Sequence, residues 1–191
     1  MKFQSILLTL CMVLGMSAKA QPKREFRGAW IQCVNGQFQG MGTQQMQETL
    51  TQQLDELQRC GINAILFQVR PEGDALYASR YEPWSRFLTG VQGQPPSPYW
   101  DPLQWMVDEC HKRGLELHAW LNPYRAKTNT TNALARTHAY QIHPERCFWY
   151  DDMILFDPGQ EVNRRYFCQI IKDILDRYDV DGIHIDDYFY P

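Results

Sequence analysis

The sequence predicts an α/β fold, and within that class a partial (β/α)8 TIM barrel of about four β/α units. Short apolar runs of strand length alternate with segments whose apolar residues recur every three or four positions, which is the pattern of buried strands joined by helices. The connections after the second and third strands are long, covering 71–100 and 124–158, whereas those after the helices are very short. Barrel enzymes have this asymmetry because the loops after their strands build the site.

Four strands and three intervening helices are expected. Asp101-Pro102 is a typical helix start, because an acidic cap precedes a proline at the first helical position, and Gly61 and Gly114 are typical helix ends. The strands are placed near 26–34, 62–70, 115–122 and 180–187, and the helices over 43–60, over 101–113 and from about 161.

A doubly wound sheet is the structural alternative to a barrel. Such sheets usually carry a glycine-rich phosphate loop after the first strand. The segment 35–42 follows the first strand here, and its glycines do not match the G-x-G-x-x-G spacing. Nucleotide binding is therefore not indicated.

Residues 1–20 have the composition of a signal peptide. Lys2 gives a positive start, 6–15 is apolar apart from one threonine, and Ala18-Lys19-Ala20 offers small residues for cleavage. The apolar run is too short to span a membrane, which takes ~20 residues. We therefore expect a signal peptide over 1–20, a single barrel-type domain over 21–191, and export to the periplasm, the cell envelope or the medium.

The charge of the exported part argues against nucleic acid as a partner. Removing 1–20 removes Lys2 and Lys19 and no acid, so the formal net charge goes from −3 to −5. An acidic chain does not attract nucleic acid or anionic lipid. Aromatic residues make up 13% of the chain, and those in loops, such as 148–150, can stack on sugar rings, although filling a core is their commoner use.

The cysteines do not define a site. Five remain after residue 20, an odd number, and no two form a C-x-x-C pair, so neither a zinc site nor a complete disulfide framework is indicated. Because exported proteins can form disulfides, one disulfide among these cysteines is retained as an alternative. The five are Cys33, Cys60, Cys110, Cys147 and Cys168.

Polar side chains gather where three of the strands end. Strand residues two apart share a face, so if the intervening apolar residues pack under helices, these sets point toward the barrel axis. A structural hydrogen bond is the alternative role for each single residue. The sets are Gln68 and Arg70; His118, Trp120, Asn122 and Arg125; and His184, Asp186 and Asp187.

Asp186 and Asp187 are adjacent acids, but they are unsuited to act as the two carboxyls of a glycosidase. Neighbouring strand residues face opposite ways, whereas those carboxyls flank one bond, ~5.5 Å or ~6.5–9.5 Å apart. Asp186 shares the face of His184 and is the better catalytic candidate, while Asp187 is expected to orient a neighbour or bind substrate. Glu72 and Asp74 are the visible candidates for the second carboxyl.

A metal site is a rival to carboxylate chemistry. His118, His184 and Asp186 could converge as a facial ligand set, but no local motif such as H-E-x-x-H supports it. The G-x-S-x-G motif of a serine nucleophile is absent too. We therefore expect no metal and no cofactor.

Several long motifs follow one another after the signal segment: Arg24–Trp30, Phe67–Tyr77, Glu82–Ser85 with Leu88–Gly90, His118–Arg125 and Asp181–Tyr188. In this order they resemble one known family, the glycosyl hydrolase-like family 10 domain. The resemblance covers essentially everything after the signal segment.

The resemblance implies a (β/α)8 barrel, export to the bacterial envelope, and hydrolysis of glycosidic bonds. Peptidoglycan glycan strands are a substrate class associated with the family, so the implied partner is an oligo- or polysaccharide. Asp186 matches the position of a nucleophile or stabilising carboxylate. Substrate contacts are expected at Gln68, Arg70, His118, Trp120, Asn122, Arg125, His184 and Asp187.

The sequence departs from the family because it ends after the fourth strand, whereas family domains resemble full barrels. The general acid expected from a later strand is absent, so we expect a truncated, N-terminal half of the domain that is inactive by itself. Two other functions stay open: a non-catalytic carbohydrate-binding module and a metal-dependent hydrolase.

Overall fold

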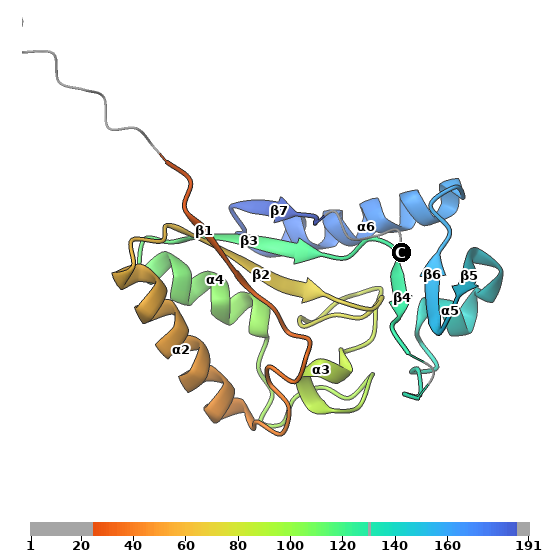
Figure 1. Cartoon of the computed structure of the whole chain (residues 1–191), viewed down its shortest axis with the longest axis horizontal. Coiled ribbons are helices and arrows are strands. Elements are labelled where there is room, and N and C mark those ends of the chain that lie inside the picture. Colours follow the sequence, from red (N-terminus) through yellow and green to blue (C-terminus); the bar gives the residue numbers. More distant parts are fainter. Residues whose placement is uncertain (1–24, 130, 187–191) are drawn as a thin grey trace, which may run out of the picture.

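The computed structural model describes residues 25–129 and 131–186, so the expected signal peptide and Asp187 lie outside the described residues (Figure 1). Its main sheet has four parallel strands in the order β1-β2-β3-β7. These are β1 (Gly28–Ile31), β2 (Ala64–Arg70), β3 (Glu116–Leu121) and β7 (Gly182–His184). The predicted parallel α/β arrangement is therefore confirmed.

Three helices cover one face of this sheet: α2 (Thr43–Arg59), α4 (Pro102–Lys112) and α6 (Glu161–Arg177). The core between them is built from alternate strand residues and the apolar stripe of each helix. Burying each such side chain is worth about 1.5–3 kcal/mol. Fully buried members include Ile65, Phe67, Leu117 and Ala119 from the strands and Leu50, Leu54, Leu103, Met106, Ile170 and Ile174 from the helices.

The opposite face of the sheet carries larger and more polar residues, arranged in layers by the strand register. Trp30, Leu66, His118 and Gly182 form one level, because each is paired with the next across the sheet. Gln68, Trp120 and His184 form the next level toward the carboxyl ends of the strands. Barrel interiors are filled by such layers.

Both long connections, predicted to be loops, contain regular structure. The first holds the short helix α3 (Arg86–Thr89). The second holds a three-stranded antiparallel sheet in the order β4-β6-β5. Its elements are β4 (Arg125–Lys127), α5 (Ala139–Ile142), the 3-10 turn η1 (Pro144–Arg146), β5 (Cys147–Tyr150) and β6 (Met153–Phe156).

A local signal for the small sheet is present in the sequence. Two four-residue runs, 147–150 and 153–156, flank Asp151-Asp152, and Asp151 adopts a positive φ of 49°. A two-residue connection containing aspartate is typical of a hairpin. Figure 1 shows the arrowheads of β2 and β3 pointing toward this small sheet, which therefore stands at the carboxyl-terminal edge of the main one.

The described residues show no disulfide and no membrane-spanning helix. The five cysteines after residue 20 are all free thiols, and Cys33 and Cys110 are buried in the core. No helix within 25–129 or 131–186 is long and apolar enough to cross a bilayer.

Candidate active site

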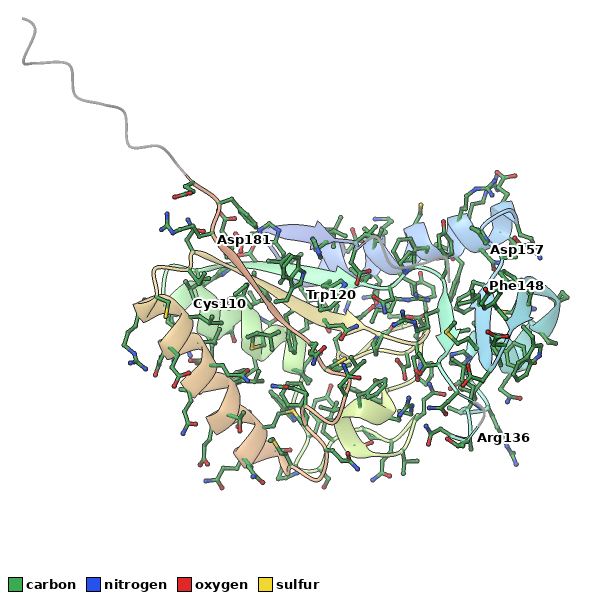
Figure 2. The ribbon with its side chains drawn as sticks, in the orientation of Figure 1. Cys110, Trp120, Arg136, Phe148, Asp157 and Asp181 are labelled. Carbon is green, nitrogen blue, oxygen red and sulfur yellow. The ribbon has the colours of Figure 1, made fainter. Side chains whose placement is uncertain are left out.

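A pocket of about 630 Å³ opens at the carboxyl ends of the main strands. Five of the predicted site residues line it, namely Gln68, Trp120, Asn122, Arg125 and Asp186. The strand order explains their convergence, since parallel strands end at one edge of the sheet. Trp120 lies over the centre of the main sheet in Figure 2. The lining also includes residues that strand periodicity does not predict: Asn35, Arg86, Phe87, Thr128 and Asn129.

Three polar atoms of the pocket residues are buried without a hydrogen-bond partner in the part of the chain that the structure describes. They are Trp120 Nε1, Asn122 Oδ1 and Asp186 Oδ1. Buried polar atoms are nearly always paired, so unpaired ones call for an explanation. One N–H donor and two oxygen acceptors around one pocket suit a ligand rich in hydroxyl groups, which both donate and accept.

Gln68 is held in the pocket wall by the chain that follows β1. Its Oε1 accepts a hydrogen bond from the backbone N–H of Cys33 at 3.1 Å. This contact leaves the amide nitrogen as the group that can face a ligand. The segment after β1 therefore fixes the orientation of Gln68, whose neighbour across the sheet is Trp120 on β3.

His184 lies in the same layer as Gln68 and Trp120 but does not itself line the pocket. Trp30 Nε1–H donates to His184 Nε2 at 3.1 Å, and the rings of Trp30 and Trp120 meet that of His184 edge-on at 5.7 and 6.3 Å. Burial, with a smaller contribution from His118, lowers the pKa of His184, although Asp186 opposes the change. The neutral imidazole therefore accepts from Trp30.

His118 lies one layer further from the pocket and contacts its neighbours instead. Its Nε2 is 3.1 Å from Glu116, and its ring meets that of Phe26 edge-on at 5.3 Å. A Cβ at Gly182 would lie 2.3 Å from His118 Nδ1, so the imidazole packs directly over the glycine backbone. The predicted substrate contact of His118 has no support from this position.

Arg70 was expected to contact substrate, but its side chain is fully buried behind the pocket. It forms an ion pair with Glu82 at 2.6 Å, and both side chains have no exposed surface. Its Nη1 also donates to the carbonyl oxygens of Asn122 and Pro123, and its guanidinium lies over the rings of Phe156 and Phe167. The register between β2 and β3 shifts between Gln68 and Arg70, so Arg70 is paired with the core residue Leu121, and the loop after β2 supplies Glu82 as its buried partner. Strand parity alone therefore misplaced Arg70.

The two alternatives for the second carboxyl lie in different surroundings. Asp74 is fully buried and bonded to Gln92 at 2.8 Å, and it does not line the pocket. Glu72 does line it, but both of its carboxylate oxygens already accept hydrogen bonds, one of them from Arg86 Nε at 3.0 Å. Neither side chain is placed to protonate a leaving group.

The buried Asp74 predicts an unusual dependence of stability on pH. Burial raises its pKa to about 7; the nearby Glu72 adds to the rise, and the hydrogen bond from Gln92 opposes it. A carboxyl whose pKa is raised by folding is costly to ionise in the folded state, so its contribution worsens as pH rises from about 4 to about 7. We expect Asp74→Asn to flatten this decline in urea-unfolding midpoints.

The exposed Asp176→Asn serves as the matched control for Asp74, because Asp176 lies on the surface of α6 beside Lys172. It measures the effect of an aspartate-to-asparagine change made outside the core. An Asp74→Asn profile parallel to that of the wild type would contradict the prediction.

Gly73 is required where the loop after β2 turns beneath the pocket. Its φ is +62°, and a Cβ there would lie 2.8 Å from Nε2 of the buried His138, which donates to the carbonyl oxygen of Glu72 at 2.9 Å. Gly73→Ala adds the left-handed backbone cost to overpacking, for a loss of about 2–5 kcal/mol of unfolding free energy.

Gly61→Ala isolates the backbone part of that cost. Gly61 has a φ of +80° with nothing within 4 Å of a Cβ, so only about 1–2 kcal/mol should be lost. Chemical denaturation measures both variants, and equal losses would show that the contact with His138 contributes nothing.

No three or more His, Cys, Asp or Glu side chains are grouped to hold a metal ion in the described part of the chain. His118 and His184 lie at successive levels of the sheet, and Asp186 follows the end of β7.

Residues 25–191 match the family described as glycosyl hydrolase-like 10. The chain belongs to that family. This glycosyl hydrolase-like 10 chain is 38% identical over 192 residues to glycosyl hydrolase YngK of Bacillus subtilis, a match covering 97% of this chain and 37% of that protein. It is 40% identical over 154 residues to glycosyl hydrolase DigH of Escherichia coli K12, covering 75% and 35% respectively. It thus spans less than two fifths of these relatives.

Solved structures similar to this glycosyl hydrolase-like 10 chain confirm the predicted partial TIM barrel. A maltogenic alpha-amylase, AmyB, from Thermotoga neapolitana superposes with a TM-score of 0.54 at 15% identity, over 86% of this chain and 40% of that one. A putative alpha-amylase from Salmonella typhimurium gives 0.51 at 15% identity, over 85% and 26%. At these identities the likeness concerns the fold alone.

Proposed function

We propose that this chain contributes the Asp186 side of a glycoside-hydrolase site. The observation that supports this most directly is Asp186 Oδ1, which is buried in a pocket at the carboxyl ends of barrel strands and has no hydrogen-bond partner within residues 25–129 and 131–186. A carboxylate there stabilises or attacks the oxocarbenium-like centre of the sugar while an acid protonates the leaving oxygen. Family membership and barrel fold support the same chemistry.

The other pocket residues bind the sugar around that carboxylate. Trp120 Nε1–H donates to a sugar oxygen, and Asn122 Oδ1 accepts from a hydroxyl. These contacts pair two atoms that have no partner in the described part of the chain. Such polar contacts fix the orientation of a ligand in its pocket. Gln68 and Arg125 lie at the same pocket and add further donors.

The substrate is a glycan of the bacterial envelope or of the environment, with peptidoglycan glycan strands the first to test. Export through residues 1–20 would bring the chain to such a substrate. The chain by itself does not hydrolyse glycans in this proposal. Among the described residues no further strand pairs with the outer edges of β1 and β7, and the chain spans less than two fifths of YngK and DigH.

A chimera tests the proposal. The chain replaces the matching part of the Bacillus subtilis relative, and release of reducing ends from purified peptidoglycan glycan strands and from a panel of other glycans is measured beside the chain alone. We expect release by the chimera only. If a folded chimera binds glycan but releases no reducing ends, the result would contradict the hydrolase proposal and favour a carbohydrate-binding module. Loss of release on chelation would favour a metal-dependent hydrolase.

A further inference from the structure

Arg86 reaches the same pocket from the loop after β2. It is the first residue of α3, and its side chain is 19% exposed on the pocket surface. Its position results from two contacts, one with a carboxylate and one with an aromatic ring, and neither partner belongs to a strand of the main sheet.

Glu72 fixes one edge of the Arg86 guanidinium. Glu72 Oε2 accepts from Arg86 Nε at 3.0 Å, and Oε1 accepts from Arg86 Nη2 at 3.1 Å. Oε1 also accepts from the backbone N–H of Thr128 at 3.1 Å and from its hydroxyl. The Glu72 side chain is only 1% exposed, so this carboxylate is an anchor inside the wall and not itself a surface for ligand.

Phe87 fixes the plane of the same guanidinium. The Arg86 Cζ lies 4.0 Å from the centre of the Phe87 ring, a cation–π contact. With one edge bonded and one flat side stacked, the group has little freedom to rotate. An arginine has five N–H donors in a planar fork, and the Glu72 pair engages only those of Nε and one of Nη2. The remaining edge, centred on Nη1, makes no hydrogen bond within the described residues.

We infer that Arg86 is a specificity-determining residue that binds a pair of oxygen atoms on the sugar held beside Asp186. The inference rests on the proposed function and deepens it. A planar fork matches two oxygens in a fixed geometry, either those of a carboxylate substituent or two neighbouring hydroxyls. Because Glu72 and Phe87 hold the fork in place, binding loses little side-chain freedom, which favours affinity.

Binding by the purified chain tests this inference. Isothermal titration calorimetry uses two probes, neutral chitotetraose and acidic tetragalacturonate, so that the arms separate hydroxyl pairs from carboxylates. Arg86→Ala should raise the dissociation constant of the preferred probe about tenfold to a hundredfold, which corresponds to the loss of hydrogen bonds to a charged group. Arg86→Lys should raise it nearly as much, because lysine keeps the charge and loses the planar fork.

Arg113→Ala is the matched control. Arg113 is 14% exposed and pairs with Glu109 at 2.6 Å and Asp55 at 2.8 Å, but it ends α4 and does not line the pocket. It should leave both affinities unchanged. Circular dichroism confirms folding, and if Arg86→Ala does not fold, Arg86→Lys decides.

Wild-type affinity in Arg86→Lys would overturn the inference, as would the absence of binding by the wild type to both probes. The proposed function fails separately: a folded chimera that binds sugar through Arg86 and releases no reducing ends would contradict hydrolysis and leave the Arg86 inference standing.

Discussion

Asp186→Asn is expected to lower the rate of glycan hydrolysis by the chimera about 10²- to 10⁴-fold. The amide has nearly the same shape as the carboxylate but carries no charge, so it neither attacks nor stabilises the positive centre of the sugar. Asp186 Oδ1 has no partner within the described residues, so the substitution breaks no observed hydrogen bond of that atom. Reducing-end release at saturating substrate, with calorimetric binding in parallel, separates turnover from affinity.

Asp181→Asn is the matched control for this prediction. Asp186 follows β7, whereas Asp181 precedes that strand at its amino-terminal end. There Asp181 accepts a hydrogen bond from Leu117 N–H at 2.7 Å and lies 2.9 Å from His111. Figure 2 shows Asp181 at the end of the main sheet that lies away from the small sheet of β4, β5 and β6. Turnover should stay within a few fold of the wild type. Wild-type turnover in Asp186→Asn would remove Asp186 from the mechanism.

Arg70→Met is expected to cost about 3–5 kcal/mol of unfolding free energy, the usual consequence of removing one partner of a buried ion pair. The pair with Glu82 has no exposed side-chain surface, so the remaining carboxylate would be left without its main partner; Tyr166 offers it only a long hydrogen bond of 3.3 Å. Urea denaturation followed by circular dichroism measures the loss.

Two further variants test whether the loss of unfolding free energy in Arg70→Met comes from the unpaired charge of Glu82. Arg70→Met combined with Glu82→Gln should recover part of it, because the stranded charge is gone. Arg165→Met removes an exposed partner of Glu161 on α6 and should change stability by less than about 1 kcal/mol. A loss from Arg70→Met as small as that from Arg165→Met would show that the buried pair does not stabilise the fold.

The main sheet and its helices could be predicted because their patterns are local. Alternating strand residues such as Leu117 and Ala119 pack under the helices as expected. The structured strands are shorter than the apolar runs, since ladder pairing ends before the apolar residues do: the first covers 28–31 where 26–34 was expected, and the last 182–184 where 180–187 was expected. The residues that line the pocket from strand ends followed from the same periodicity.

The rest of the site depends on contacts between distant segments, which periodicity does not encode. Glu72, Arg86 and Thr128 meet only because the loops after β2 and β3 fold over one another. Arg70 lies two residues after Gln68, so strand periodicity predicts that it faces the pocket. It instead forms a buried ion pair with Glu82 from the covering loop. In both cases the tertiary partner, rather than the strand pattern, decides whether a side chain meets ligand or protein.

The hydrogen bond between Trp30 and His184 has a consequence for how the barrel wall forms. β1 and β7 are the outermost strands of a four-stranded sheet, separated by β2 and β3. Neighbouring strands lie ~4.8 Å apart and side chains stand nearly perpendicular to a sheet, so on a flat sheet the two edges could not touch. Here Trp30 and His184 meet at 3.1 Å across the concave side. These four strands therefore already carry the curvature of the closed wall. The difference in fluorescence between the wild type and Trp30→Phe would report whether that curvature is kept, since the chain has six tryptophans.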